Sequence, residues 1–550
     1  MELLGLHIAI WIVLVIYLAG MLLLGWWSKR EAANQEGYLL GNRQFGWLMM
    51  VMHSFGAGTH PGAPAGVISK TVSHGASGIW VSWMWMFGTP FYWLIAPLIR
   101  RMRLLTMADY FEQRFSRWAS LLYVVVATVG MTVMLASVLL ATTRTVQGIM
   151  GKAESDPWFF GILLVITAVF IVYSYWGGIV AAIRTDMIQG FMIIGLSFIA
   201  IPAALNLPEV GGMAGMRQTL LETDPSYLRL FDAKQFNWVT VLLLSMNAPL
   251  SMLAMPHLMS VCAAGRSEWE GRVGFTYGNI LKRLCTIGWC VLGLCWLAYL
   301  INSQSEIHPD AAFGDSIRVL LSPVLQGVML ACVMAAAMSS GDAIQVTVGG
   351  LFSQNIYRTY MRPDAAEDQL VRVTRHTGLV VAFSGVIIAI LMRSSVVKAI
   401  LDYLNILSLI GMSVALGIVW RRMNTAGVVT SAVLAVATFI VTRYVYNYPR
   451  QIVTGLPLLT GLIGGVLGSV LSRAPDSNQV ERFFQKMYVP IGQEDQLTRS
   501  LDETVPPDRR LLTGAGFFLV KPSRQSWMGF LITLAISVGA VLFMIALLRT

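Results

Sequence analysis

Charged residues are scarce in this chain of 550 residues: 12% are Asp, Glu, Lys or Arg, whereas 56% are hydrophobic. So little charge excludes an ordinary soluble domain and is typical of a protein that crosses a membrane many times. The chain has only five cysteines, and their spacing argues against both a disulfide framework and a zinc site. The formal net charge is +10, but the basic residues gather in short loops between apolar segments, which argues against nucleic-acid binding.

The sequence also lacks the features of a cleavable leader. The first apolar stretch has no basic region before it and no small-residue cleavage site, so we expect it to remain as a helix in the lipid bilayer. In all, about fourteen apolar stretches are long enough to span a bilayer. They lie near residues 5–27, 45–69, 77–99, 118–142, 158–176, 184–206, 237–263, 278–302, 320–350, 375–393, 397–420, 425–446, 453–472 and 525–549.

Basic residues in the short loops predict the orientation, because Lys and Arg are enriched on the cytoplasmic side. With the N-terminus outside, the positively charged loops fall on the inner side, and an even number of spans places the C-terminus outside as well. We include Lys282 and Arg283 among these inner residues, at the start of the span near 278–302. The others are Lys29, Arg30, Arg43, Arg100, Arg101, Arg103, Arg114, Arg117, Arg266, Arg272, Arg358, Arg362, Arg372, Arg375, Arg421 and Arg422.

Spans and polar stretches together predict the division of the chain. Two runs of five spans are accompanied by single helices and by two polar stretches in which no catalytic motif is visible. In order, the units are a first helix with its cytoplasmic loop (1–44), a first five-helix repeat (45–206), an extracellular loop (207–236), a second five-helix repeat (237–424), two further spans (425–472), a cytoplasmic polar segment (473–524) and a C-terminal helix (525–550).

Helix-breaking residues interrupt the first span of each five-helix run. The segment Ser54–Gly62 holds several glycines and a proline, so we expect no continuous helix there. In the second run, Pro249 and Pro256 interrupt the span near 237–263. Broken helices at matching positions of two halves are typical of inverted-repeat transporters, whose binding site lies at mid-membrane.

Another unusual stretch, 331–345, places two adjacent hydroxyls and a carboxylate inside an apolar segment. Ala336, Ser339 and Asp342 follow one helix face, with Ser340 beside them. Hydroxyl and carbonyl oxygens are hard ligands that suit Na⁺ better than a soft metal. The alternative is helix packing, in which each serine hydroxyl bonds to the carbonyl four residues earlier.

Several stretches in order carry a resemblance to a known family. The most recognisable is Tyr175–Gln189, which reads YWGGIVAAIRTDMIQ. The others are Gly37–Arg43 (GYLLGNR), Arg103–Phe115 (RLLTMADYFEQRF), Pro256-His257, and Trp420–Asn424 (WRRMN) followed by Gly427. Together they resemble the sodium:solute symporter family, which includes sodium-coupled sugar, proline, pantothenate and sialic acid carriers. The likeness covers nearly all of residues 1–470.

The resemblance implies an all-α, LeuT-type fold in which residues 45–206 and 237–424 form a 5+5 inverted repeat. It also implies one principal Na⁺ site between the first broken span and the span that carries the two serines. The implied ligands are the backbone carbonyls of Met52, Phe55 and Ala336 and the hydroxyls of Ser339 and Ser340. Such neutral oxygens bind a monovalent cation weakly enough to release it in every cycle.

Asp186 matches an aspartate of the family for which the resemblance implies a role on the sodium exit path. Some members form a second sodium site there with serines, whereas this chain has Asp342 and Ala343 in that neighbourhood. A second carboxylate beside Asp186 could strengthen cation binding or hold a shared proton. Alternatively, Arg184 or another basic residue neutralises Asp186.

Polar side chains beside the two breaks are candidates for substrate contacts, with core packing as an equal alternative for each. His53 is a candidate either as a ligand or as a proton carrier. Trp83 and Trp85 could supply aromatic walls. The other candidates are Ser54, Thr59, His60, Ser82, Asn247, Asn405 and Ser408.

We conclude from the sequence that the chain is a Na⁺-coupled symporter of a small organic solute in the plasma membrane, with a bacterial inner membrane as the expected location. The closest alternatives are a proton-coupled symporter and a transporter-like sensor of the same fold. A channel is disfavoured because no segment resembles a repeated carbonyl filter. An enzyme is disfavoured because no nucleophile–base set or metal cluster is visible. The solute, the stoichiometry and the oligomeric state stay open.

Overall fold

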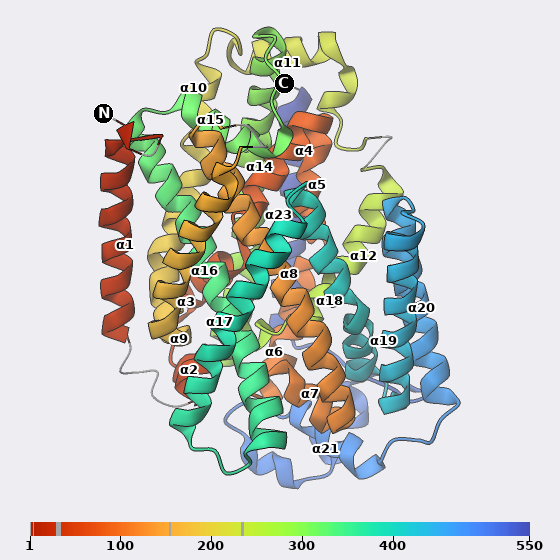
Figure 1. Ribbon diagram of the computed structural model, residues 1–550. Helices are drawn as coiled ribbons and strands as arrows, with labels where there is room; N and C mark the ends of the chain where they lie inside the picture. Colours follow the sequence, from red (N-terminus) through yellow and green to blue (C-terminus); the bar gives the residue numbers. More distant parts are fainter. Residues whose placement is uncertain (1, 4, 29–34, 153–155, 233–235, 550) are drawn as a thin grey trace.

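The computed structural model describes residues 2–3, 5–28, 35–152, 156–232 and 236–549. Figure 1 shows a bundle of helices with both termini at its upper end. The helices up to residue 223 are α1 (Ile8–Ser28), α2 (Gln35–Leu40), α3 (Trp47–Gly58), α4 (Gly62–His74), α5 (Trp80–Trp83), α6 (Tyr92–Arg101), α7 (Met107–Arg114), α8 (Arg117–Ile149), α9 (Trp158–Phe198), α10 (Ile201–Leu205) and α11 (Gly212–Thr223). The later helices are α12 (Trp238–Ala254), α13 (Leu258–Ala263), α14 (Glu268–Asn302), α15 (Ala312–Leu320), α16 (Pro323–Phe352), α17 (Glu367–Leu391), α18 (Val396–Val419), α19 (Thr425–Ile440), α20 (Arg450–Val470), α21 (Ser477–Tyr488), α22 (Leu501–Thr504) and α23 (Arg524–Arg549).

Among the described residues, 9 helices are long and apolar enough to cross a membrane. They are Arg117–Ile149, Ile179–Leu205, Glu268–Asn302, Pro323–Met361, Glu367–Leu391, Val396–Val419, Thr425–Val445, Arg450–Val470 and Arg524–Arg549. Shorter apolar helices are Ile8–Leu24, Trp158–Val169 and Trp238–Ala254. These helices confirm a multi-pass membrane protein, whereas fourteen spans and an outside N-terminus stay predictions.

The expected break in the first interrupted span is confirmed. α3 ends at Gly58, and α4 begins at Gly62 with Pro61 as its N-cap. The amide of Thr59 donates to the carbonyl of Gly56 at 3.0 Å, which closes α3 with a tight final turn. Pro61 has no amide hydrogen and cannot extend the helical ladder. The unwound residues are buried in protein, as backbone outside a helix must be at membrane depth.

The second interrupted span breaks between α12 and α13. Met255 is extended, with φ −64° and ψ 122°, because a residue before proline is disfavoured in the helical conformation. Pro249, which we also expected to interrupt this span, lies inside α12 instead. Its ring packs against Gly88, where an added methyl group would meet the ring at 2.9 Å. The segment that contains Gly88 therefore packs closely against this proline.

The apolar stretch 77–99 is not the single span that we expected. It passes through a 3-10 turn (Gly75–Ile79), α5, a further turn, a second 3-10 turn (Thr89–Phe91) and α6. Gly88 and Pro90 explain the interruption, since glycine favours a flexible backbone and proline removes a helical donor. The surrounding protein shields this irregular backbone, and Trp80 and Trp83 are buried.

α9 is described as one helix of 41 residues, although we expected two spans near 158–176 and 184–206. Residues 179–183, part of the expected loop, are helical and buried. The side chains of residues 170 and 172–178 lie outside the described set. The described part of this region contains a short apolar helix, Trp158–Val169, and a candidate span, Ile179–Leu205. Residues 179–183, which we expected to lie in a loop, therefore belong to a helix.

α14 begins at Glu268, well before the predicted start near 278. Its first turn is capped by the side chain of Ser267, which accepts a hydrogen bond from the amide of Trp269. Lys282 and Arg283 consequently lie in the middle of a buried helix, at 6% and 1% exposure, and not at the inner membrane surface as we expected. This corrects their use in the orientation argument.

Glycines bring α14 close to α3. A methyl group added to Gly278 would meet the carbonyl of Val51 at 2.6 Å, and one added to Gly274 would meet the side chain of Met50 at 2.6 Å. Small residues at helix contacts in membranes allow this close backbone approach. The position of Lys282 beside the end of α3 follows from the tight contact.

The polar segment after α20 covers the lower end of the bundle (Figure 1). It contains α21, α22 and an antiparallel hairpin of β3 (Arg510–Gly514) and β4 (Phe517–Val520). Phe483 of α21 packs edge-on against Tyr110 of α7, with ring centroids 5.5 Å apart. A second small hairpin, β1 (Glu2–Leu3) with β2 (Leu6–His7), precedes α1.

Candidate functional site

The end of α3 meets the middle of α16 inside the bundle. The hydroxyl of Ser340 donates to the carbonyls of Gly56 and Ala57, both at 3.3 Å. These carbonyls belong to the last turn of α3, where the ordinary amide donors four residues later are missing, although that of Gly56 also accepts from the amide of Thr59. Ser340 is fully buried. Its hydroxyl therefore joins two helices, and the alternative of bonding only within α16 does not describe it.

Two buried oxygens face Gly56. A methyl group placed on Gly56 would come within 2.6 Å of Ser339 Oγ and 3.3 Å of Asp186 Oδ1. Neither oxygen makes a hydrogen bond of good geometry with the described residues, although Ser339 and Asp186 lie close enough to interact with each other. A buried polar atom is costly unless a ligand or water completes its bonding. The space beside Gly56 is thus lined by a hydroxyl, a carboxylate and helix-end carbonyls, which are hard oxygens suited to a monovalent cation.

The other predicted sodium ligands lie on the same two helices. Phe55 is in the last turn of α3, next to Gly56. Met52 lies about one turn earlier, and Ala336 lies one turn before Ser340 on α16. Both are within continuous helix, where a carbonyl ordinarily accepts from the amide four residues later. The structure brings the serines to the end of α3, and the three carbonyl ligands stay predictions.

Asp186 has a partner that the sequence argument did not consider for it. Its Oδ2 lies 2.7 Å from Nδ1 of His53, and both side chains are completely buried. His53 is on α3, one turn before the Gly56 contact, and Asp186 is on α9. The carboxylate therefore pairs with an imidazole at the edge of the cation space, and neutralisation by Arg184 stays a prediction.

Asp342 is buried on α16 and has interaction partners of its own. Asp342 and Asp186 both lie near Tyr17 of α1. The Tyr17 hydroxyl in turn accepts a hydrogen bond from Gln189 at 3.0 Å. The two carboxylates thus approach the same tyrosine between α1, α9 and α16, and a second cation site there stays a prediction.

A central cavity of about 30 Å³ lies between the two broken spans. Of the predicted substrate candidates, Ser54 and Trp85 line it. The hydroxyl of Ser54 also accepts a hydrogen bond from Asn279 at 3.4 Å. The lining residues are Ser54, Gly58, Trp85, Met134, Met252, Met255, His257, Val261, Phe275, Asn279, Lys282, Arg283 and Tyr403.

Most other substrate candidates bond within the protein. The pairs are Ser82 with Thr286 at 2.9 Å, Asn247 with Asn405 at 3.2 Å, and Ser408 with the carbonyl of Asn405 at 2.8 Å. Thr59 and His60 differ because they occupy the break between α3 and α4. The hydroxyl of Thr59 and Nδ1 of His60 are buried and have no hydrogen-bond partner within the described part of the chain. These two residues keep a free polar atom for a ligand.

Two basic residues of the central cavity, Lys282 and Arg283, are absent from the sequence-based candidates. Lys282 donates a hydrogen bond to the carbonyl of Gly58, at the end of α3. Both cations lie over the ring of Trp85, at 5.5 Å for Lys282 and 5.4 Å for Arg283. The available signal was a pair of charges inside a long apolar pattern, since an ionisable residue at membrane depth indicates a functional site.

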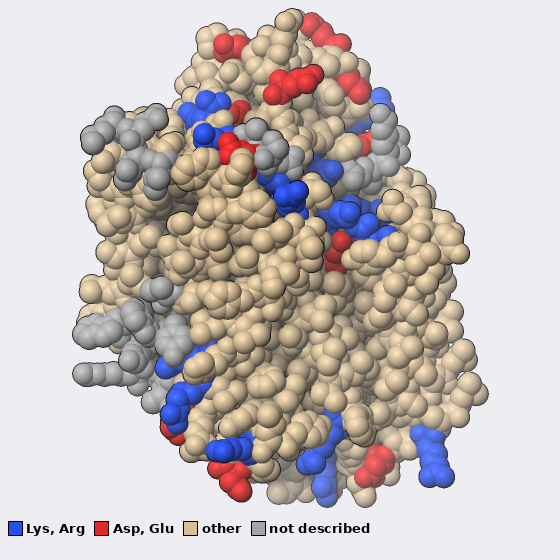
Figure 2. Space-filling view, in the orientation of Figure 1, with Lys and Arg blue, Asp and Glu red and all other residues tan. Residues whose placement is uncertain are grey.

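A larger cavity of about 370 Å³ opens between α4, α18 and α20. Figure 2 shows basic side chains gathered around a hollow in the upper half of this face. Its basic lining residues are Lys70, Lys398, Arg443 and Arg450. Asp402 supplies an acidic group, which pairs with Arg443 at 3.1 Å. We call this cavity the basic vestibule; α18 lines both it and the central cavity.

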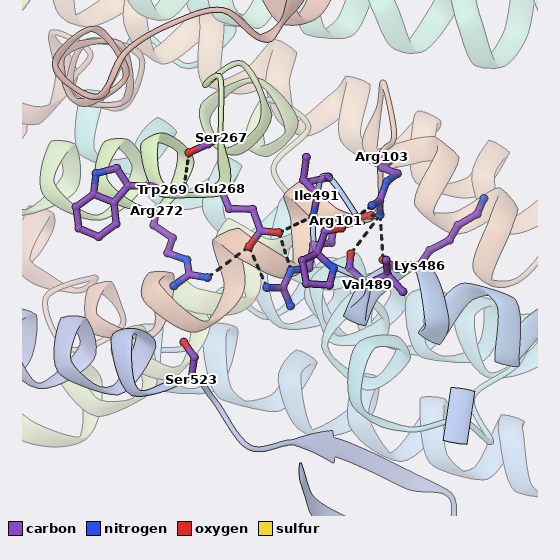
Figure 3. A network of polar contacts seen from close by, with 12 residues as sticks. Arg101, Arg103, Ser267, Glu268, Trp269, Arg272, Lys486, Val489, Ile491 and Ser523 are labelled. Atoms are coloured by element: carbon purple, nitrogen blue, oxygen red, sulfur yellow. Dashed lines mark hydrogen bonds and ion pairs between the residues drawn. The ribbon is translucent and has the colours of Figure 1, made fainter. Parts of the chain in front are cut away.

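A network of ion pairs holds the lower end of the bundle together (Figure 3). Glu268 of α14 accepts hydrogen bonds from Arg101 at 2.8 and 2.9 Å and from the amide of Ile491 at 3.0 Å. Arg103 donates to Glu494 at 2.9 Å, and this bond holds the pKa of Glu494 below its ordinary value. The network ties the polar segment after α20 to α6 and α14.

Comparison with known proteins identifies relatives that match this chain over most of its length. Among curated relatives, the osmoregulated proline transporter OpuE of Bacillus subtilis (strain 168) is 26% identical over 480 residues, covering 84% of this chain and 93% of its own length. The sodium/proline symporter of Salmonella typhimurium is 24% identical over 509 residues, covering 85% and 94%.

Solved structures share the fold. A Na⁺-coupled sialic acid symporter in a substrate-bound, outward-open state matches with a TM-score of 0.71 at 18% identity, covering 85% of this chain and 98% of its own. MHP1, a nucleobase-cation-symport-1 family transporter in a closed conformation, matches with a TM-score of 0.52 at 10% identity, covering 82% and 98%.

The family itself follows from a match over most of the chain. The family model described as "Sodium:solute symporter family" matches residues 38–435, from within α2 into α19. This range includes both broken spans, the α3–α16 contact and the central cavity. The chain therefore belongs to the sodium:solute symporter family: it is a transporter and not an enzyme, and its activity is sodium-coupled symport.

Proposed function

We propose that the chain couples the entry of Na⁺ to the uptake of a small organic solute across a bacterial inner membrane. Na⁺ binds between α3 and α16, with the hydroxyls of Ser339 and Ser340 and the carbonyls of Met52, Phe55 and Ala336 as ligands. The single observation that carries the assignment is the pair of buried oxygens, Ser339 Oγ and Asp186 Oδ1, that face Gly56 without a hydrogen bond of good geometry.

The broken helix explains how the ion controls the solute site. α3 contributes its last turn to the cation space and Gly58 to the central cavity, so one short segment touches both. Na⁺ binding fixes the end of α3 against α16 and thereby favours the conformation that accepts solute. Because coupling free energies are reciprocal, solute binding strengthens Na⁺ binding by the same factor.

The proposed architecture is a LeuT-type 5+5 repeat of residues 45–206 and 237–424, with 1–44, 425–472 and 525–550 as peripheral spans. The polar stretches 207–236 and 473–524 lie outside and inside the cell, respectively. Alternating access then moves one group of helices against the other around the breaks. Both termini at one end of the bundle support an even number of crossings (Figure 1).

Proton coupling is the second candidate, and the His53–Asp186 pair is the observation that favours it. Ionisable side chains that pair with one another inside membrane-spanning segments are typical of proton relays. The pair borders the same space beside Gly56, so a proton on it would compete with a cation for Asp186. Sodium coupling therefore requires Asp186 to be free to bind the cation, whereas proton coupling requires the His53–Asp186 pair to carry a proton.

A binding measurement that needs no solute tests the sodium site. We expect NaCl, titrated against choline chloride at constant ionic strength, to raise the melting temperature of the purified protein with saturation, and KCl to raise it much less. Equal responses to Na⁺ and K⁺ would contradict the site. In proteoliposomes, uptake driven by an inward pH gradient without Na⁺, at the rate seen with Na⁺, would establish the proton alternative.

A further inference from the structure

Lys282 and Arg283 form a pair of neighbouring cations at the centre of the membrane domain. They occupy the middle of α14 and are 6% and 1% exposed. The indole of Trp83 donates to the carbonyl of Arg283 at 2.9 Å, which fixes the backbone of α14 at this point. Two like charges at this depth repel each other and lose their hydration, so they require a compensating interaction.

The described residues supply little of that compensation. No carboxylate among them lies within ion-pair distance of either cation. Lys282 has the carbonyl of Gly58 as a partner, whereas Nε and Nη1 of Arg283 are buried without hydrogen-bond partners. Trp85, whose ring lies beneath both cations, provides a weaker attraction. The guanidinium therefore retains donors for an anion.

The rest of the cavity indicates that this anion is organic. Met134, Met252, Met255, Val261 and Phe275 contribute apolar surface to the lining, beside polar groups that include Ser54 and Asn279. An inorganic ion such as chloride would gain nothing from such a surface, whereas the carbon skeleton of a carboxylic acid would be buried against it. The two cations and the apolar residues together match the charge and the carbon skeleton of a small carboxylate, and the cavity of about 30 Å³ has to widen to admit one.

The basic vestibule strengthens the argument independently. Lys70, Lys398, Arg443 and Arg450 line it, and the acidic group of Asp402 is already paired with Arg443. A cavity lined by one sign of charge raises the local concentration of ligands of the opposite sign. α18 leads from this vestibule to Tyr403 in the central cavity.

From these contacts we propose that the solute is a small organic carboxylate, held by Arg283 and Lys282 in the central cavity. The proposal rests on the proposed symport function and adds the class of solute to it. The two oxygens of the carboxylate accept two parallel hydrogen bonds from the guanidinium of Arg283, the bidentate arrangement that arginine favours. Lys282 adds a second positive charge beside the carboxylate and links the site to Gly58, the last residue of α3.

Binding to the full-length purified protein tests the charge of the solute. We would titrate lactate, pyruvate and succinate in sodium sulfate and follow the melting temperature, with lactamide and succinamide as uncharged probes of matched shape. At least one carboxylate should stabilise the protein with saturation, and its amide should not. The proposal would be overturned if only the amides stabilised the protein, or if none of the carboxylates did. It would also be overturned if chloride, added to the sodium sulfate buffer, were the only anion that stabilised it.

Substitution of the two cations tests their role in the same assay. Arg283→Gln and Lys282→Gln should each weaken carboxylate binding by about tenfold or more, because a charge-assisted hydrogen bond is lost. Arg144→Gln is the matched control, since Arg144 is a buried arginine on α8 outside both cavities. Carboxylate affinity that is unchanged in both cavity variants would overturn the proposal.

Stabilisation by Na⁺ in the absence of carboxylates distinguishes a failure of the proposed symport function from a failure of the carboxylate proposal. It should survive in Arg283→Gln, which leaves the bond of Lys282 to Gly58 at the end of α3 intact. If Na⁺ stabilises the protein and carboxylates do not, the symport function stands and the carboxylate class is wrong. If Na⁺ has no specific effect, the proposed sodium site itself is wrong. Should Arg283→Gln fail to fold, Arg283→Lys, which keeps the charge but loses the fork, should retain partial carboxylate affinity.

Discussion

His53 Nδ1 lies 2.7 Å from Asp186 Oδ2, and neither side chain is accessible to solvent. The two residues are 133 positions apart in the sequence, so the contact joins the broken helix α3 to α9. The second carboxylate oxygen faces Gly56, where the hydroxyl of Ser339 also points. One carboxylate thus connects a histidine to the proposed cation space.

Replacement of Asp186 by asparagine should impair coupling while the protein still folds. The amide keeps the shape of the side chain but removes the negative charge beside the cation, so we expect the sodium half-saturation of uptake to rise about tenfold or uptake to be lost. Asp315→Asn is the control, because Asp315 pairs with Arg318 on α15, away from this site. An unchanged sodium titration in Asp186→Asn would reduce Asp186 to a structural partner of His53.

Gly56 and Gly58 provide a matched pair in the last turn of α3. A methyl group on Gly56 would lie 2.6 Å from Ser339 Oγ, too close for contact, whereas one on Gly58 would meet nothing within 4 Å. Gly56→Ala should therefore fill the cation space and abolish the specific stabilisation by Na⁺, and Gly58→Ala should keep it. Thermal melting in NaCl and in choline chloride measures both. Equal behaviour of the two variants would contradict a cation space at Gly56.

The two breaks could be predicted from the sequence because glycine and proline act locally. The density of these residues in Ser54–Gly62 is incompatible with an intact helix whatever surrounds it. Pro249 shows the limit of such an argument. A lone proline can remain inside a helix, as Pro249 does in α12, and the space for its ring against the packed neighbour depends on Gly88 from a distant segment.

The charged residues of the site were harder to place. Lys282 and Arg283 match the pattern of an inner loop if α14 begins near 278, and the true start at Glu268 moves them to mid-membrane. The His53–Asp186 contact depends on how α3 packs against α9, which no local pattern specifies. The serine pair could be found because small and hydroxyl residues within an apolar segment have few other uses.

The ion-pair network at the lower end should stabilise the folded protein. Glu268 interacts with Arg101, Arg272 and the amide of Ile491, so Glu268→Gln leaves partly buried arginines without their counter-charge. We expect the free energy of unfolding to fall by about 1–3 kcal/mol, seen as a lower melting temperature. Glu494→Gln is the control, because its single pair with Arg103 is more exposed and should matter little. Equal melting temperatures for both variants would show that the network carries no special weight.

Ser339 and Ser340 are adjacent, yet their surroundings predict different effects of substitution by alanine. Ser339 Oγ makes no hydrogen bond of good geometry with the described residues, so Ser339→Ala should leave the melting temperature without Na⁺ unchanged or slightly higher.

Ser340 Oγ donates to the carbonyls of Gly56 and Ala57, so Ser340→Ala should cost about 1 kcal/mol of stability. Both variants should nevertheless weaken Na⁺ binding about tenfold, since each removes an oxygen ligand worth on the order of 1–2 kcal/mol. Because linkage is reciprocal, solute affinity should fall at limiting Na⁺ and recover at saturating Na⁺. A sodium titration of melting temperature and of uptake, normalised to protein in the membrane, measures each effect. If Ser340→Ala alone lost stability and neither titration shifted, the serines would serve only to pack α16 against α3, and the cation would have to bind elsewhere.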